Sequence, residues 1–200
     1  MAKQIFIDPS ECRKPSFEHF HDIPVNQYQK RMADVRAEFS DQELKDIFHD
    51  MLAIRTFEHM LQDLRLTGKY NDVDYNYSGH AHLCIGQECA AVGQAFALDE
   101  NDFIFGTHRG HGELIAKGLR TLRLLDDGRL QRIMETSCGG EQLRAVRRGF
   151  SGSTRELAQR FFMYGIMAEI FGRKTGFAEG LGNSMHAFFI PFGIYPNNAL

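Results

Sequence analysis

The sequence lacks the features that mark several broad classes of protein. No apolar stretch approaches the roughly 20 residues of a membrane span, and the N-terminal MAKQIFIDPSE has no apolar core before a cleavage site. Basic and acidic residues nearly balance, at 23 Lys and Arg against 26 Asp and Glu, whereas a nucleic-acid-binding surface is normally basic. These absences predict a cytoplasmic globular protein that binds neither a membrane nor nucleic acid.

Cysteine is scarce as well. The four cysteines, Cys12, Cys84, Cys89 and Cys138, form no C-x-x-C pair, and their spacing matches no zinc pattern. Cytosolic thiols stay reduced, so no disulfide framework is expected. We expect Cys84 and Cys89 to pack as small apolar residues, and we predict no metal site from the cysteines.

Two common phosphate-binding fingerprints, G-x-x-x-x-G-K-[ST] and G-x-G-x-x-G, are also missing. Three other segments combine glycine with ionisable side chains. They are GHAHLCIGQE at Gly79–Glu88, FGTHRGHG at Phe105–Gly112 and GLGNSMH at Gly180–His186. Glycine lets backbone approach a ligand closely, while Arg and His supply charge and proton transfer. The combination indicates a site for an anionic, phosphate-bearing ligand.

Helical periodicity dominates the chain. Ser40 and Glu43 form the pattern of a capping box, and apolar residues follow at helical spacing as far as Leu64, with Gly68 as the stop. Further helices are expected from about Gly86, over His111–Gly118 and over Arg155–Phe171. Residues 1–39, with three prolines and little periodicity, predict an irregular N-terminal extension ahead of a domain at 40–200.

Strands are scarce. Phe103–Phe105 is a candidate for a short buried strand, and the polar Tyr70–Ser78 is expected to be a loop. Leucines at helical spacing across residues 120–160 predict a helical hairpin inserted into the domain. Gly/Ser-rich breaks interrupt this insertion at Ser137–Gly140 and Gly149–Ser153.

Four ordered segments together resemble a known family. They are MLAIRTFE, GHAHLCIGQECAAVG, DENDFIFGTHRGHGELIAKG and MAEIFGRKTGFAEGLGNSMH. They resemble the alpha subunit of the thiamine-diphosphate-dependent 2-oxo acid dehydrogenases, the decarboxylating component of the pyruvate, branched-chain and acetoin dehydrogenase complexes. The resemblance implies an α/β fold. This chain would form the helix-rich N-terminal part of the thiamine-diphosphate-binding fold, with most of the parallel sheet beyond its end.

The resemblance also implies roles for individual residues. Arg109 would bind the cofactor diphosphate through its bidentate fork, with His108 in place of the family's common Tyr. His111 would be catalytic and face the reactive thiazolium carbon; the alternative is a loop histidine whose hydrogen bonds are satisfied by the protein. The residues implied for the substrate pocket are His80, His82 and His186, and those whose backbone would hold the cofactor's aminopyrimidine ring are Ala199 and Leu200.

Alternatives stay open at four positions: His80, His82, Glu88 and Asn183. His80 stands where pyruvate-type members commonly have Phe, so it would either bind a polar group of the substrate or point away. His82 and Glu88 each have either a structural or a functional role. Glu88 lies in the first turn of a predicted helix, where a carboxylate is favourable for structural reasons alone. Asn183 replaces the family's usual Gly, and Asn is the best substitute if that position has a positive φ.

One family motif is missing. The magnesium site of the family is a GDG motif followed by an Asn pair; this sequence has no GDG, and Asn197-Asn198 has none before it. The sequence therefore predicts a fragment that ends within an element, whose magnesium ligands lie beyond residue 200 and which is inactive in isolation.

The activity that the resemblance implies is oxidative decarboxylation of a 2-oxo acid, with acyl transfer to a lipoyl group. The implied partners are a beta subunit or fused beta half and a lipoyl-bearing acyltransferase core, in an oligomer. Two alternatives remain. One is an acetoin dehydrogenase alpha-type subunit, and the other is a non-catalytic assembly or regulatory module.

Overall fold

The computed structural model describes residues 8–17, 19–25 and 27–196, and the chain divides into two compact units, Met1–Glu38 and Phe39–Leu200. Within the described part of the chain, no helix is long and apolar enough to cross a membrane. The candidate site lies entirely in the second unit.

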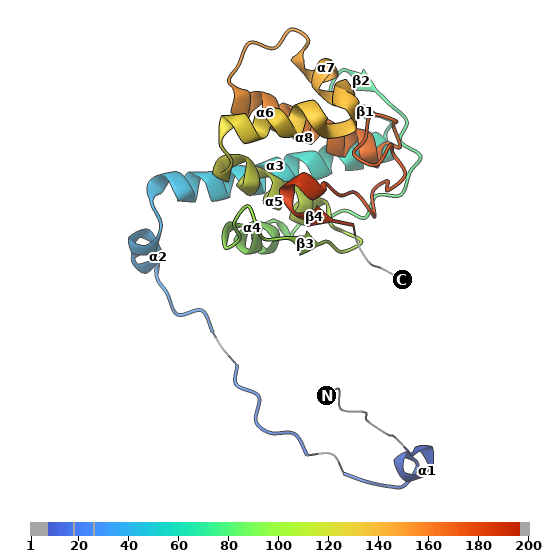
Figure 1. Cartoon of the computed structure of the whole chain (residues 1–200). Helices are drawn as coiled ribbons and strands as arrows, with labels where there is room; N and C mark the ends of the chain where they lie inside the picture. The colour runs from blue at the N-terminus through green and yellow to red at the C-terminus, as the bar shows by residue number, and fades with distance from the viewer. Residues whose placement is uncertain (1–7, 18, 26, 197–200) are drawn as a thin grey trace. The chain divides into compact units, whose positions relative to one another are not determined.

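The first unit contains two short helices, α1 (Pro9–Cys12) and α2 (Met32–Glu38) (Figure 1). The side chain of Asp8 caps α1 by accepting a hydrogen bond from the backbone N of Ser10 at 2.8 Å. Pro9 fits the first turn because that position needs no backbone N–H donor. Apart from these two helices, the described residues of this unit form no helix or strand, so the expected irregularity holds for most of them.

The long helix expected after Ser40 is present as α3 (Asp41–Leu66), and its capping box is confirmed. Ser40 Oγ accepts a hydrogen bond from the backbone N of Glu43 at 3.2 Å, and the Glu43 carboxylate accepts one from the backbone N of Ser40 at 2.7 Å. Gly68 follows the helix with a φ of +71°, as a helix stop requires. Ile54 and Leu61 lie on the buried face of α3, which contacts α4 and α5.

Five further helices follow in the described part of the second unit. They are α4 (Glu88–Phe96), α5 (His111–Leu124), α6 (Asp127–Thr136), α7 (Glu141–Arg147) and α8 (Thr154–Ile170), with 3-10 turns η1 (Ser137–Gly140) and η2 (Ile190–Phe192). Helix α5 contacts α3, α4 and α8, so it occupies the centre of the second unit (Figure 1). The helices expected near Gly86, from His111 and over Arg155–Phe171 are thus confirmed.

The helices in 120–160 partly follow the expectation. Helix α5 runs on to Leu124, so residues 120–124 belong to it. Helices α6 and α7 both pack on α8, and the break between them is η1, where Cys138 and both glycines that follow have positive φ. That these helices form an insertion stays a prediction.

The described residues contain only four two-residue strands. The expected loop at Tyr70–Ser78 was wrong in part, because β1 (Lys69–Tyr70) and β2 (Val73–Asp74) form an antiparallel hairpin. The strand expected at Phe103–Phe105 is β3 (Ile104–Phe105), which pairs in parallel with β4 (Ile194–Tyr195).

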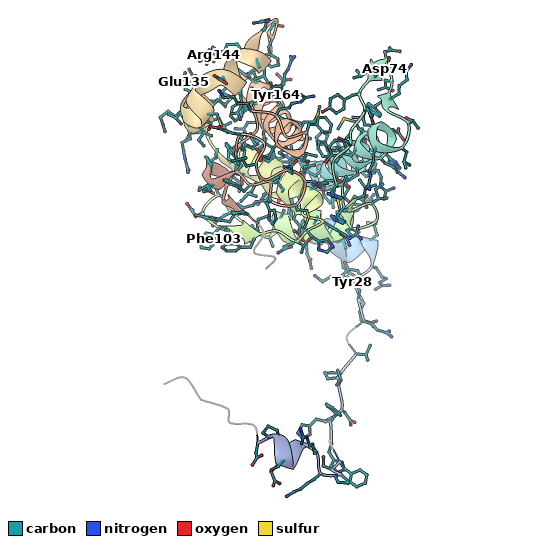
Figure 2. The ribbon with its side chains drawn as sticks, turned by 90° about the vertical axis from the view of Figure 1, so that its right-hand side faces the viewer. Tyr28, Asp74, Phe103, Glu135, Arg144 and Tyr164 are labelled. Carbon is teal, nitrogen blue, oxygen red and sulfur yellow. The ribbon has the colours of Figure 1, made fainter. Side chains whose placement is uncertain are left out.

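The expected burial of this strand was wrong. Phe103 is 63% exposed and Phe105 58% exposed, and Phe103 lies at the surface of the second unit (Figure 2). Both rings contact Tyr195 at centroid distances of 5.7 and 5.4 Å. The described chain is therefore helix-rich, as expected, and its parallel sheet is limited to one short pair.

Candidate active site

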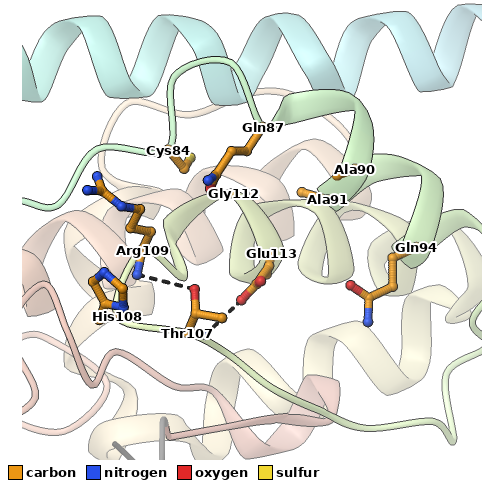
Figure 3. A pocket seen from close by; sticks show the side chains of 10 residues that line it. All are labelled: Cys84, Gln87, Ala90, Ala91, Gln94, Thr107, His108, Arg109, Gly112 and Glu113. Atoms are coloured by element: carbon orange, nitrogen blue, oxygen red, sulfur yellow. Dashed lines mark hydrogen bonds between the residues drawn. The ribbon is translucent and has the colours of Figure 1, made fainter. Parts of the chain in front are cut away.

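The segment FGTHRGHG forms a tight loop that leads into α5. The Glu113 carboxylate accepts a hydrogen bond from the backbone N of Thr107 at 2.9 Å, and Thr107 Oγ1 accepts one from the backbone N of Arg109 at 3.3 Å (Figure 3). A Cβ at Gly110 would lie 2.8 Å from the Thr107 carbonyl oxygen, so the turn leaves no room for a side chain there. The loop thereby holds His108 and Arg109 in exposed positions just before the helix.

Arg109 connects this loop to the GHAHLCIGQE segment. Its Nη1 donates a hydrogen bond to the carbonyl oxygen of Leu83 at 2.7 Å, and the rings of His82 and His108 meet edge to face at a centroid distance of 5.4 Å. Partial burial, followed by the charges of His108 and Arg109, lowers the pKa of His82. The lowered pKa favours the neutral form of the His82 ring.

A cavity of about 470 Å³ opens between α4 and this loop (Figure 3). That volume falls within the range of small-molecule sites. The lining residues are Cys84, Gln87, Ala90, Ala91, Gln94, Thr107, His108, Arg109, Gly112 and Glu113. Two of the predicted cofactor-binding residues, His108 and Arg109, thus share one cavity with the start of α5.

His111 occupies a different environment from Arg109, although only two residues separate them. Its side chain is 1% exposed; Nδ1 lies 2.7 Å from Glu58 Oε1, and Nε2 lies 2.8 Å from Ser184 Oγ and 3.2 Å from the Ser184 carbonyl oxygen. The second Glu58 oxygen accepts a hydrogen bond from the backbone N of Cys84 at 2.8 Å. Both ring nitrogens of His111 therefore have protein partners, as the alternative interpretation of this histidine expected.

The GLGNSMH segment is shaped by one buried carboxylate. Glu169 accepts hydrogen bonds from the backbone N atoms of Ala178, Gly180 and Gly182 at 2.8, 3.0 and 2.7 Å. Asn183 has a φ of +51°, which accounts for Asn where the family usually has Gly. This fold places Ser184 against His111.

Glu88 and the two cysteines nearby have structural positions. The Glu88 carboxylate accepts hydrogen bonds from Arg55 Nε at 2.6 Å and from the backbone N of Gly86 at 3.1 Å, and the Arg55 bond is the main reason that its pKa falls to about 2. Cys84 is buried as expected, and burial raises the pKa of its thiol to about 12. Cys89 is exposed, so its expected burial was wrong.

The other predicted site residues do not gather at the cavity. His80 is exposed, and its backbone oxygen accepts a hydrogen bond from the Tyr77 hydroxyl at 2.9 Å. His80, His82 and His186 are not lining residues of the 470 Å³ cavity, although His82 touches His108. Ala199 and Leu200 lie outside the described residues.

Glu58 is the residue of the site that sequence reasoning missed. It lies four residues after Ile54 and three before Leu61, so it interrupts the buried apolar face of α3 with a carboxylate that is fully buried. A carboxylate in that position needs a donor, and this was the available signal. Its partners could not be read from the sequence, because Cys84 and His111 lie 26 and 53 residues further on.

The described residues contain no group of three or more His, Cys, Asp or Glu side chains that could hold a metal ion. A diphosphate needs donors rather than acidic ligands, and those are present. Arg109 uses Nη1 for Leu83, while its remaining guanidinium N–H groups have no partner within the described part of the chain. The site therefore fits an anion, and it does not by itself fit a divalent cation.

Residues 70–149 match the family described as Dehydrogenase E1 component. The chain is 30% identical over 154 residues to the alpha subunit of acetoin:2,6-dichlorophenolindophenol oxidoreductase from Bacillus subtilis, with 77% of this chain and 32% of that protein covered. It is 30% identical to the pyruvate dehydrogenase E1 component subunit alpha of Rhizobium meliloti, with 76% and 30% covered.

A third relative is the 2-oxoisovalerate dehydrogenase subunit alpha of Bacillus subtilis, 32% identical over 105 residues, with 52% of this chain and 29% of that protein covered. No solved structure matches the chain. The chain spans about a third of the length of the curated relatives it matches. It belongs, as a distant homologue, to the E1 alpha subunit family of the pyruvate, acetoin and branched-chain 2-oxo acid dehydrogenases.

Proposed function

We propose that this chain contributes the diphosphate-binding part of a thiamine-diphosphate-dependent 2-oxo acid dehydrogenase of the alpha-subunit type. The observation that carries the proposal is the convergence of three segments far apart in the sequence. Arg109 donates to Leu83, and His111 contacts Ser184, so the GHAHLCIGQE, FGTHRGHG and GLGNSMH segments meet at the start of α5. A helical scaffold without a ligand has no need for this concentration of glycine, histidine and arginine.

In this proposal Arg109 and His108 bind the diphosphate. Arg109 is anchored at one nitrogen by the Leu83 carbonyl, which orients the planar guanidinium before a ligand arrives. His108 adds a ring N–H donor beside it. When bound, thiamine diphosphate supplies the nucleophilic carbon that permits loss of carbon dioxide from a 2-oxo acid, and the protein supplies orientation and charge. We expect Ala199 and Leu200 to contribute backbone contacts to the cofactor's ring.

His111 is proposed to hydrogen-bond the reacting centre through Nε2. In the described structure that nitrogen faces Ser184, beside a cavity of only about 10 Å³. Such a space admits no substrate. The role therefore requires segment 180–186 to move and release Nε2. His80, His82 and His186 are proposed to face the substrate in the assembled enzyme, where His80 would favour a polar group on the substrate.

The metal and the partners are also part of the proposal. No metal step is assigned to the described residues, because they present no acidic cluster; magnesium ligands would come from other sequence. The complete reaction, with acyl transfer to a lipoyl group, would require a beta subunit or fused beta half and an acyltransferase core. Acetoin as substrate is the alternative that the Bacillus subtilis oxidoreductase relative favours.

The test is direct binding of thiamine diphosphate in the presence of Mg²⁺, measured by calorimetry on the wild-type chain and on Arg109→Ala. Loss of charge-assisted hydrogen bonds costs about 1.5–3 kcal/mol, so Arg109→Ala should weaken binding roughly 10- to 150-fold. Arg144→Ala, an exposed arginine on α7, is the matched control and should bind like the wild type. Equal binding by Arg109→Ala and wild type would contradict the proposal. A wild-type chain that ignores the cofactor but binds a beta-type subunit would favour the assembly module instead.

A further inference from the structure

Glu58, on helix α3, hydrogen-bonds two of the three converging segments. One oxygen accepts from the backbone N of Cys84 at 2.8 Å, and the other lies 2.7 Å from His111 Nδ1. The side chain is 0% exposed, so water does not compete for either oxygen. Leu83, next to Cys84, accepts the Arg109 hydrogen bond. Glu58 therefore also supports the loop segment that orients Arg109.

The donors around Glu58 determine where the histidine proton lies. The Cys84 backbone N–H can only donate, so it requires one Glu58 oxygen as an acceptor. An ionised carboxylate offers its other oxygen as an acceptor too, and a proton on His111 Nδ1 satisfies it. Nε2 is then left without a proton and accepts from the Ser184 hydroxyl at 2.8 Å, the shorter of its two contacts with Ser184. The Ser184 carbonyl oxygen, 3.2 Å away, is an acceptor only, so it would be hydrogen-bonded only if Nε2 carried a proton.

We propose that Glu58 is a positioning residue that holds the proton of His111 on Nδ1 and leaves Nε2 as an acceptor directed at Ser184. The inference rests on the proposed function in one respect only: the proposed function explains why this tautomer of His111 would matter. An Nε2 that lacks a proton can accept one from a reacting group once segment 180–186 moves away. Glu58 itself touches neither cofactor nor substrate in this arrangement.

A Ser–His–acid chain of these lengths also occurs in hydrolases, where the serine is the nucleophile. That interpretation fails here. Ser184 is 3% exposed, and the adjacent cavity of about 10 Å³ has no room for an acyl group. Ser184 therefore serves as a hydrogen-bond partner of the His111 ring. In this hydrogen-bonded triad, His111 and not Ser184 is the residue proposed to act on a substrate.

The test measures the tautomer directly, by long-range ¹H–¹⁵N correlation of histidine side chains in the ¹⁵N-labelled, cofactor-free full chain at pH 8. His111→Gln assigns the ring by loss of its signals, and Ser184→Ala, which perturbs the same ring, assigns it if that variant does not fold. The wild type should show a protonated Nδ1 and an unprotonated Nε2. A proton on Nε2, in a neutral or a doubly protonated ring, would overturn the proposal.

Glu58→Gln sharpens the test because an amide has one acceptor and one donor. With its oxygen on the Cys84 N–H, its NH₂ must donate to His111 Nδ1, so the ring should switch to the Nε2–H form. An unchanged tautomer in a folded Glu58→Gln variant would contradict the proposal, and if that variant does not fold, the wild-type spectrum alone decides.

Asp50→Asn is the matched control for this exchange. Asp50 is also a buried carboxylate on α3, two turns before Glu58, but its partners are Arg123 and the exposed His49. The variant should keep the wild-type tautomer of His111, and a switch there would show that Glu58→Gln acts through general loosening of the core. Because the spectra need no cofactor, a failure of cofactor binding leaves this result intact, and the reverse also holds.

Discussion

The two ends of α5 differ in the contacts that set their role. At its N-terminal end, His111 meets Glu58 and Ser184 through side-chain hydrogen bonds. In its C-terminal half, Leu119 and Leu122 are almost fully buried and Gly118 faces the ring of Phe162 on α8, and this apolar packing stands beside the Arg123 hydrogen bond to Asp50. Apolar contacts tolerate small shifts, whereas hydrogen bonds of 2.7–2.8 Å do not. The C-terminal half therefore supports the fold, and the N-terminal end sets the geometry of the site.

The largest expected effect on stability comes from a substitution in the C-terminal half of α5, where the helix packs against α8. A Cβ at Gly118 would lie 2.0 Å from the Phe162 ring, so Gly118→Ala forces the helices apart. Overpacking of this kind costs about 1–3 kcal/mol or more, and we expect about 3 kcal/mol of lost unfolding free energy in urea titrations. Cofactor binding by the folded fraction should change little, because Gly118 lies two turns from His111.

Gly93→Ala is the control for this substitution. Gly93 lies within α4 and has open space where its Cβ would be, so alanine should raise stability by about 0.5–1 kcal/mol through helix propensity. Equal losses for both substitutions would show that helix α5 does not depend on close approach to Phe162.

A smaller effect is expected at the loop that Arg109 contacts. Arg55 and Gly86 hold Glu88 with a pKa of about 2, below its usual value of 4.5. A depressed carboxylate pKa contributes stability above about pH 4.5, and this contribution is lost as the pH falls towards 2. Because Arg55 is 45% exposed, screening reduces the gain to about 1 kcal/mol.

Glu88→Gln should therefore be about 1 kcal/mol less stable than wild type at pH 7, and the gap should close between pH 4.5 and 2. Glu179→Gln, at an exposed carboxylate, provides the control curve. A gap that stays constant down to pH 2 would assign the loss to altered packing and not to ionisation.

The helices that pack the fold were largely predictable from the sequence. The hydrogen bonds that position His111 at the N-terminal end of α5 were not. Helical spacing and the capping box located α3 because neighbours in sequence determine both. The burial of His111 depends on Ser184, 73 residues away, so local sequence shows the segments but not that their side chains close on each other. Exposure of Phe105 and Cys89 was missed for the same reason, because burial depends on which elements pack together.

The smallest expected effect is that of Asn183→Gly, in the segment that covers His111, and Asn183→Ala provides the contrast. Asn183 combines a φ of +51° with a hydrogen bond from Nδ2 to the Gly180 carbonyl oxygen at 3.0 Å. Asn183→Ala keeps the unfavourable backbone angle and loses the bond, so it should cost about 1–2 kcal/mol. Asn183→Gly loses the bond but relieves the angle, so its unfolding free energy should stay within about 0.5 kcal/mol of wild type.

Asn71 offers a comparison within the same chain, because it has the same φ of +51° in the turn of the β1–β2 hairpin. Asn71→Ala should lose stability to a similar degree and leave the His111 ring signals unchanged, whereas Asn183→Ala should shift them through the adjacent Ser184. If Asn183→Gly proved as costly as Asn183→Ala, the hydrogen bond rather than the backbone angle would explain asparagine at this position. If both left the His111 signals unchanged, Ser184 would be held by Glu169 and its glycine-rich turn alone.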